Sequence, residues 1–188
     1  QRLADAFTPL AKGMNSEYAN QNAYDAISIH GGSGFIMEYK SQRLYRDARI
    51  FSIYEGTTQL QVVAAIRYIS NGTMLQNIKN MFEALPENAD TALKARVEKL
   101  IPVYEEALSY AKSLGDQAAF DFLARRLYDM TCELVMSLLI IRDAAKAPEM
   151  FAKSAQVYVR MTEEDVCGKS AYIKNFRVED LDNFKAAE

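Results

Sequence analysis

Hydrophobic residues recur along most of this chain at spacings of three and four positions, which is the period of an amphipathic helix. A helix-like run opens the chain at residues 2–7. Beyond it, the pattern predicts helices over the ranges 13–30, 41–48, 57–70, 73–85, 91–114, 116–146 and 148–168. The sequence therefore predicts an all-α protein.

One apolar stripe on each predicted helix is expected to face a core. In the first four helices its members are Met14, Tyr18, Ala19, Ala23, Ala26 and Ile27; Leu44 and Ala48; Leu60, Val63, Ala64 and Tyr68; and Leu75, Ile78, Phe82 and Leu85. In the later helices they include Leu93, Val97, Leu100, Ile101, Tyr104, Leu108 and Ala111, and then Phe151, Ala155, Tyr158 and Thr162. Residues 134–141 are apolar nearly all round, which predicts a helix enclosed on every side.

Residues that cap or break helices mark the predicted ends. Expected starts are the capping boxes Thr58–Gln61 and Thr73–Gln76, the caps Asp90 or Thr91 and Asp116, and Pro148 in a first turn. Expected stops are Asn71-Gly72, Gly115 and Gly168. Pro102 lies inside a predicted helix and is expected to bend it.

The chain divides into two parts by composition. Residues 1–72 hold the glycine cluster and the unusual polar motifs, whereas residues 73–188 contain four amphipathic helices. Helices joined by short links predict an antiparallel bundle for the second part. Its polar tail offers the possible anchors Phe176, Val178, Leu181 and Phe184.

Charge and cysteine content narrow the class of protein. The 188 residues include 22 Lys and Arg and 25 Asp and Glu, a net charge of −3 that argues against a nucleic-acid partner. The longest apolar run, 134–141, is broken by Ser137 and is too short for a membrane span. The two cysteines, Cys132 and Cys167, are expected to be small core hydrophobes, so neither a disulfide framework nor a metal site is predicted.

The start of the chain resembles the inside of a helix. It opens at Gln1 without an initiator Met, a basic segment or an apolar segment, so no signal peptide is visible. We therefore expect a piece of a longer protein.

Three short motifs follow one another in the first part. They are HGGSGF at 30–35, RDARI at 46–50 and IYEGTTQ at 53–59. Taken singly, each has a common structural explanation: a turn, a solvated face of ion pairs, and an exposed or capping glutamate.

Glu55 has a more specific interpretation. The apolar residues before it indicate that the chain is buried as it reaches Glu55, and Gly56 then leaves room beside the carboxylate. The helix that begins at Thr57 points free N–H groups and a positive dipole end at the same space. This combination suits a general base that faces a substrate developing negative charge.

Together, HGGSGF, RDARI and IYEGTTQLQ, preceded by TPLAK at 8–12, resemble the signature near the end of the C-terminal helical domain of the acyl-CoA dehydrogenase family. The resemblance covers about residues 8–70 and includes the spacing of the motifs. The residues that follow resemble the longer members of that family, which add a C-terminal helical domain.

The resemblance implies a flavoprotein of fatty acid metabolism that oxidises an acyl-CoA thioester to its trans-2-enoyl-CoA. Glu55 matches the catalytic base that removes the α-proton while hydride leaves the β-carbon for flavin N5. The backbone N–H of the same glutamate contributes to hydrogen bonding of the thioester oxygen, so that enolate-like charge is stabilised as it forms.

The resemblance also implies binding residues. Tyr54 and Gly56 match positions beside the acyl chain, and Thr57 and Gln59 match residues that contact FAD near its phosphates and adenosine. The loop residues His30, Gly31 and Gly32 match a loop that reaches the FAD of a neighbouring subunit. At Ser28 the family often has Gln, so this possible cofactor contact is shorter here.

Two functions remain open. The first is part of an acyl-CoA dehydrogenase, with electron-transfer flavoprotein as partner and a homodimer or homotetramer as assembly. The second is a protein of the same fold that acts as a non-catalytic assembly or interaction module. Glu55 within an intact IYEGT favours the first. The family places such an enzyme in the bacterial cytoplasm, or in the mitochondrial matrix if the source is eukaryotic.

A first prediction concerns these 188 residues by themselves. They should fold, because the apolar stripes bury one another, but they should not retain FAD, because too few cofactor contacts are present to offset the cost of association. The purified chain is expected to show helical circular dichroism and no flavin absorbance after incubation with FAD. A yellow, active preparation would contradict this.

Overall fold

A computed structural model describes residues 2–184, with side chains from Leu3 onward. These residues form helices and turns, and no strand occurs among them. They divide between Ala65 and Ile66 into two compact units, which are described separately. The expected all-α fold is therefore confirmed.

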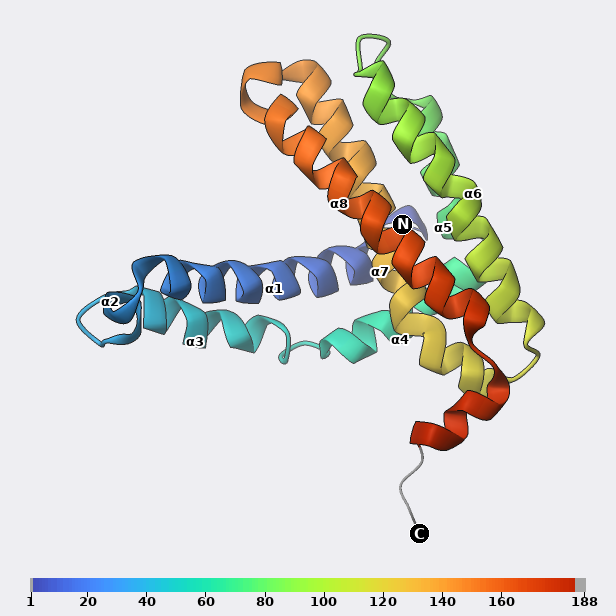
Figure 1. The fold of residues 1–188 in the computed structure, drawn as a ribbon, viewed down its shortest axis with the longest axis horizontal. Helices are drawn as coiled ribbons and strands as arrows, with labels where there is room; N and C mark the ends of the chain where they lie inside the picture. The colour runs from blue at the N-terminus through green and yellow to red at the C-terminus, as the bar shows by residue number, and fades with distance from the viewer. Residues whose placement is uncertain (1, 185–188) are drawn as a thin grey trace. The chain divides into compact units, whose positions relative to one another are not determined.

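The first unit is built on a helical hairpin. Helix α1 (Arg2–His30) and helix α3 (Ser41–Phe51) run side by side, and the short α2 (Gly32–Phe35) lies at the end where they are joined (Figure 1). Helix α1 begins eleven residues before the predicted start at residue 13, and it continues through Pro9. Burial of Ala6 and Leu10 on its early turns compensates the backbone hydrogen bond that a proline removes.

Helix α4 (Thr58–Ser70) crosses the division between the units. It begins and ends as predicted, but its buried residues are Val62, Ala65 and Ile69. Leu60 and Val63, which were expected inside, are more than half exposed, Ala64 is exposed, and Tyr68 is half-buried. Leu44 of α3 is likewise exposed, whereas Ala48 is buried as predicted. Apolar residues on α4 have helical spacing on two faces, so spacing could not identify the buried one.

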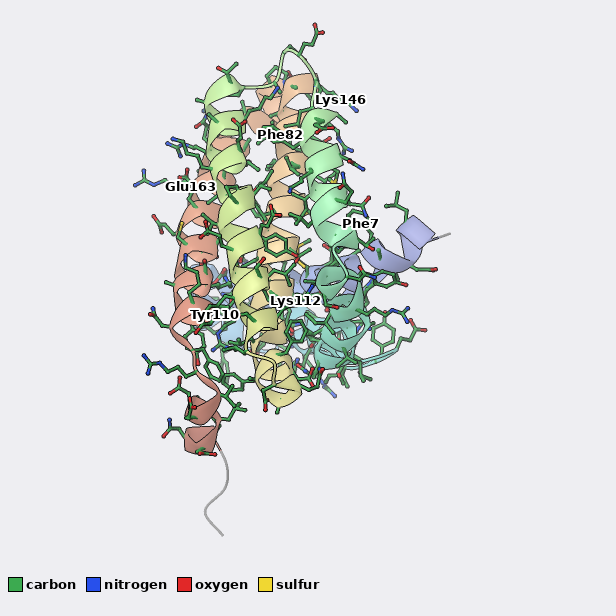
Figure 2. All side chains as sticks on the ribbon, turned by 90° about the vertical axis from the view of Figure 1, so that its right-hand side faces the viewer. Phe7, Phe82, Tyr110, Lys112, Lys146 and Glu163 are labelled. Atoms are coloured by element: carbon green, nitrogen blue, oxygen red, sulfur yellow. The ribbon has the colours of Figure 1, made fainter. Side chains whose placement is uncertain are left out.

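The second unit is a bundle of four helices, shown side by side in Figure 2. Their bounds are α5 (Thr73–Glu83), α6 (Thr91–Ser113), α7 (Gln117–Lys146) and α8 (Pro148–Asn175), followed by a 3-10 helix, η1 (Val178–Phe184). Asp90 caps α6 by accepting from the N–H groups of Ala92 and Leu93, and Asp116 caps α7 by accepting from Ala119. Both caps agree with the prediction, and Pro102 lies inside α6.

The predicted capping boxes are wrong. Thr57, not Thr58, accepts from the N–H of Leu60 at 3.3 Å at the start of α4. At the start of α5 the side chain of Asn71 accepts from the N–H of Thr73 at 3.0 Å, while Gln76 donates to Asn80. Helix α8 also does not stop at Gly168 but continues to Asn175, because burial of Ser170 and Ile173 on its last turns offsets the cost of a helical glycine.

Helix α7 forms the centre of the bundle, as its apolar sequence predicted. Leu134 and Leu138 are fully enclosed, and the polar groups buried beside them are paired. The hydroxyl of Tyr104 on α6 lies 2.8 Å from that of Thr131 on α7, and Ser137 donates to Thr162 on α8 at 3.0 Å. Burial raises the pKa of Tyr104 far above its ordinary value, so this phenol stays neutral. Of the two cysteines, Cys132 is buried in α7 as expected, but Cys167 is exposed on α8.

Aromatic side chains close one end of the bundle. Phe176 is buried and stacks on Phe122 with ring centroids 5.1 Å apart, and Phe184 lies 4.7 Å from the same ring. The hydroxyl of Tyr110, labelled on α6 in Figure 2, donates to the carbonyl of Phe176 at 2.9 Å. Phe176 and Phe184 thus anchor the tail, while Val178 and Leu181 are half-buried.

A partly buried ion pair joins the two helices with the most extensive contact. Lys169 of α8 donates to Glu133 of α7 at 2.9 Å, and Asp165 lies 3.8 Å from the same ammonium group. The second oxygen of Glu133, Oε2, is buried and has no hydrogen-bond partner among the described residues. Burial therefore raises the pKa of Glu133 to about 7, although Lys169 opposes this.

A second prediction follows for pH and stability. The folded state holds the Glu133 proton more tightly than the unfolded chain does, so the free energy of unfolding should fall as the pH rises from about 4.5 to about 7. Glu133→Gln should remove about 1–3 kcal/mol of this pH dependence, measured by urea unfolding at several pH values. Glu105→Gln, in an exposed pair with Lys79, is the control and should leave the profile unchanged. An unaltered slope for Glu133→Gln would contradict the assignment.

Candidate functional site

The turn that carries Glu55 lies between α3 and α4. Glu55 has a φ of 48° and Gly56 a φ of 93°, so two consecutive residues adopt the left-handed region. This conformation costs a residue with a side chain on the order of 1–2 kcal/mol, and contacts around the turn must offset that cost. The carboxylate of Glu55 is exposed.

Donors from two helices hold the backbone of this turn. Lys12 of α1 donates to the carbonyl of Gly56 at 2.5 Å, and Gln61 of α4 donates to the carbonyls of Gly56 and Glu55 at 3.2 and 3.4 Å. The N–H of Thr58 closes the turn onto the carbonyl of Ser52 at 3.2 Å. The backbone around Glu55 is therefore fastened both to the helix that follows it and to a helix far away in sequence.

The chain is not buried as it reaches Glu55, which corrects the expectation from its apolar sequence. Ile53 and Tyr54 are each close to half exposed, because no described residue covers their outer faces. Tyr54 contacts the ring of Phe51 at 6.1 Å, and both line a small hollow of about 200 Å³ with Lys12, Asn15 and Ser16. A Cβ at Gly56 would lie 2.7 Å from the amide nitrogen of Gln61, so the end of that flexible side chain would have to shift.

The start of α4 presents exposed polar groups beside this turn. Thr57 and Gln59 are exposed, and they stand at the positive end of a helix of 13 residues. Thr58 points elsewhere: its hydroxyl donates to Glu17 of α1 at 2.6 Å. The N–H groups of Thr58 and Leu60 are already bonded, to the carbonyl of Ser52 and to the hydroxyl of Thr57. The exposed groups beside Glu55 are therefore the side chains of Thr57 and Gln59.

The glycine loop lies at the opposite end of the α1–α3 hairpin from Glu55 (Figure 1). Gly31 has a φ of 60°, and both Gly31 and Gly32 have open space where a side chain would stand. Gly34 differs, because a Cβ there would lie 2.5 Å from the carbonyl oxygen of Ile27. His30, the last residue of α1, bonds through Nδ1 to the carbonyl of Ala26 at 3.0 Å, and Ser28 donates to that of Tyr24 at 3.3 Å.

The predicted site residues thus form two separate groups. Tyr54, Glu55, Gly56, Thr57 and Gln59 lie together at the start of α4, whereas Ser28, His30, Gly31 and Gly32 lie at the far end of the hairpin. Among the described residues, no three His, Cys, Asp or Glu side chains come together in a way that could hold a metal ion.

Sequence reasoning missed three residues that support the turn. Lys12 and Glu17 on α1 and Gln61 on α4 all reach residues 55–58. In the sequence, Lys12 was noted only as the last residue of TPLAK, and Gln61 only as the second residue of a predicted capping box. The partners of Lys12 and Gln61 are backbone carbonyls, which leave no signal in the sequence, and Glu17 accepts from the hydroxyl of Thr58, 41 positions away.

Comparison with known families covers nearly the whole chain. The family model described as "Acyl-CoA dehydrogenase C terminal" matches residues 70–181, and the one described as "Acyl-CoA dehydrogenase, C-terminal domain" matches residues 1–69.

Curated relatives match about a third of the chain. It is 54% identical over 52 residues to subunit CarC of the caffeyl-CoA reductase–Etf complex of Acetobacterium woodii, covering 28% of this chain and 14% of that protein. It is 50% identical over 58 residues to the 3-(aryl)acrylate reductase of Clostridium sporogenes, with 31% and 15% covered. It is 49% identical over 61 residues to the 3-methylmercaptopropionyl-CoA dehydrogenase of Ruegeria pomeroyi, with 32% and 10% covered. Each match therefore takes in only a small part of the relative's own length.

A solved structure has a similar fold over most of the chain. The crystal structure of Caenorhabditis elegans ACDH-11 in complex with C11-CoA matches with a TM-score of 0.61 and 20% identity, covering 93% of this chain and 30% of that one. At this identity the likeness concerns the fold alone. None of the described helices is long and apolar enough to cross a membrane.

A third prediction concerns the glycine loop in the complete protein. Gly31→Val should lower the flavin content of the purified protein, because a side chain keeps the exposed loop backbone away from a bound dinucleotide. Gly72→Val is the matched control, since Gly72 has a φ of 83° and equally open surroundings. Equal flavin absorbance in the two variants would count against a cofactor role for the loop.

Proposed function

This chain belongs to the acyl-CoA dehydrogenase family, and on that premise we propose that the complete protein is an FAD-dependent oxidoreductase that oxidises an acyl-CoA thioester to its trans-2-enoyl-CoA. The observation that carries the proposal is Glu55, held in a left-handed turn at the start of α4 with its carboxylate free to face a ligand. Residues 1–72 would end the family's C-terminal helical domain, and residues 73–188 would form the additional helical domain.

Glu55 is the proposed base. A carboxylate in water does not remove the α-proton of a thioester at a useful rate, because the enolate-like charge that develops is unstable. The positive end of α4 and the backbone N–H of Glu55 supply donors beside the carboxylate, and they are fixed before the reaction begins. Tyr54 and Gly56 lie on either side of Glu55 and would contact the acyl chain.

The exposed groups of the chain fit a dinucleotide in part. Thr57 and Gln59 at the start of α4 offer hydroxyl and amide groups to phosphates and ribose, and the open space around Gly31 and Gly32 admits a phosphate close to the backbone. When bound, FAD would accept the hydride that leaves the β-carbon. Since the two groups of residues lie at opposite ends of the hairpin, we propose that they serve FAD molecules of different subunits, in a homodimer or homotetramer.

A second candidate reverses the direction of the reaction. Two of the relatives are named as reductases, of caffeyl-CoA and of 3-(aryl)acrylate, and one of them is a subunit of a complex with Etf. The same residues serve both directions, with Glu55 as base in one and as proton donor to the α-carbon in the other. In either direction we propose electron-transfer flavoprotein as the redox partner.

A fourth prediction tests the base. In the complete protein, Glu55→Gln keeps the shape of the side chain and removes its basicity, so turnover of acyl-CoA with a dye acceptor should fall by at least ~10²-fold while flavin content is retained. Glu149→Gln, an exposed glutamate in the first turn of α8, is the control and should retain full turnover.

The same preparations distinguish the alternatives. Turnover of saturated acyl-CoA with an oxidising dye supports the dehydrogenase, and turnover only of 2-enoyl or arylacrylyl thioesters with a reduced donor supports the reductase. Near-normal turnover by Glu55→Gln would reject both proposals for Glu55. Inactivity of the unaltered protein toward both substrate panels would favour the non-catalytic module.

A further inference from the structure

We propose that Lys12 is the positioning residue for Glu55: from α1 it holds the backbone of the turn that carries this carboxylate. This inference rests on the proposed function. Lys12 does not touch the reacting atoms in this role, and it acts through the backbone on which Glu55 is carried.

Lys12 contacts both neighbours of Glu55. Its ammonium group donates to the carbonyl oxygen of Gly56 at 2.5 Å, and it also lies over the ring of Tyr54, 5.7 Å from the centroid. Charged donors make shorter and stronger hydrogen bonds than neutral ones, and a cation over an aromatic face adds to the attraction. One side chain therefore holds the residue before Glu55 and the residue after it.

The turn needs this support because its backbone is strained. Glu55 and Gly56 both have positive φ, and only the glycine adopts that region without cost. Relaxation of Glu55 to negative φ would rotate its side chain away from the start of α4. The Gly56 carbonyl comes directly after the two residues with positive φ. Loss of the hydrogen bond from Lys12 to this carbonyl would therefore make that relaxation easier.

Lys12 and Gln61 connect the turn to different helices. Gln61 also reaches the Gly56 carbonyl, but it belongs to α4, the helix that the turn itself begins. Its bond fixes the turn only relative to its own helix. Lys12 belongs to α1, and Glu17 on the same helix accepts from Thr58 at 2.6 Å just beyond the turn. The two α1 residues thus determine where Glu55 lies relative to the hairpin.

The test uses the complete protein with three variants. Lys12→Met keeps the unbranched apolar stem and removes the donor, Lys12→Arg keeps a cationic donor, and Lys153→Met is the control at an exposed lysine of α8. The readouts are kcat and KM, the isotope effect with α-deuterated acyl-CoA, flavin content, thermal stability, and amide hydrogen exchange of residues 52–57.

For Lys12→Met we expect kcat to fall about 10- to 100-fold with KM nearly unchanged, since a misplaced base slows proton abstraction without weakening binding. The isotope effect should increase, because proton abstraction then limits the rate, and amides 52–57 should exchange faster. Lys12→Arg should restore most of kcat, and Lys153→Met should match the unaltered protein.

Other outcomes overturn the proposal. Unaltered kcat and exchange in Lys12→Met would show that the turn holds itself. Loss of flavin or thermal stability in proportion to kcat, with an unchanged isotope effect, would show a structural role only. If Glu55→Gln is inactive while Lys12→Met is normal, the positioning inference fails and the proposed function stands. If Glu55→Gln is active, the proposed function fails, and hydrogen exchange still decides whether Lys12 holds the turn.

Discussion

The site depends on a pair of left-handed residues, Glu55 and Gly56, at the turn between α3 and α4. This pair lies in the turn of residues 52–57 that links α3 to α4, and it leaves Glu55 exposed just before the positive end of α4. Its conformation is unfavourable for glutamate, and donors from outside the turn bind its carbonyls. The contacts of Lys12 and Gln61 are therefore part of the site, although neither residue is expected to meet a substrate.

The second unit differs from this exposed turn, because its buried hydroxyl groups are paired with one another inside the core. The hydroxyl pairs Tyr104–Thr131 and Ser137–Thr162 join α7 to its neighbours and leave apolar contacts to fill the rest. Hydrogen bonds between buried hydroxyls fix the register of long helices, since a shifted helix would leave these groups buried without a partner, at a cost in free energy. Glu133 is the departure from this rule, with one buried oxygen unmatched among the described residues and a raised pKa as the result.

Several helix boundaries in the second unit were predictable because local signals decide them. Asp90 and Asp116 cap from within one turn, Gly115 supplies a φ of 67°, and Pro148 fits a first turn. The predicted stop at Gly168 was wrong, because a glycine ends a helix only when the residues after it gain little by remaining helical. Here Ile173, in the continued helix, is fully buried. Similarly, Pro9 does not end α1, since buried Ala6 and Leu10 lie on either side of it.

By itself, the sequence determined the all-α class, the family, the central place of α7 and the identity of Glu55 as the candidate base. These conclusions depend on periodicity and on linear motifs, both of which are properties of neighbouring residues. The tertiary structure decided which face of α4 is buried, that Ile53 and Tyr54 remain exposed, and that the two groups of candidate ligand-binding residues are apart. It also identified Lys12, because a contact between a side chain and a distant backbone carbonyl exists only once the chain has brought α1 against the turn.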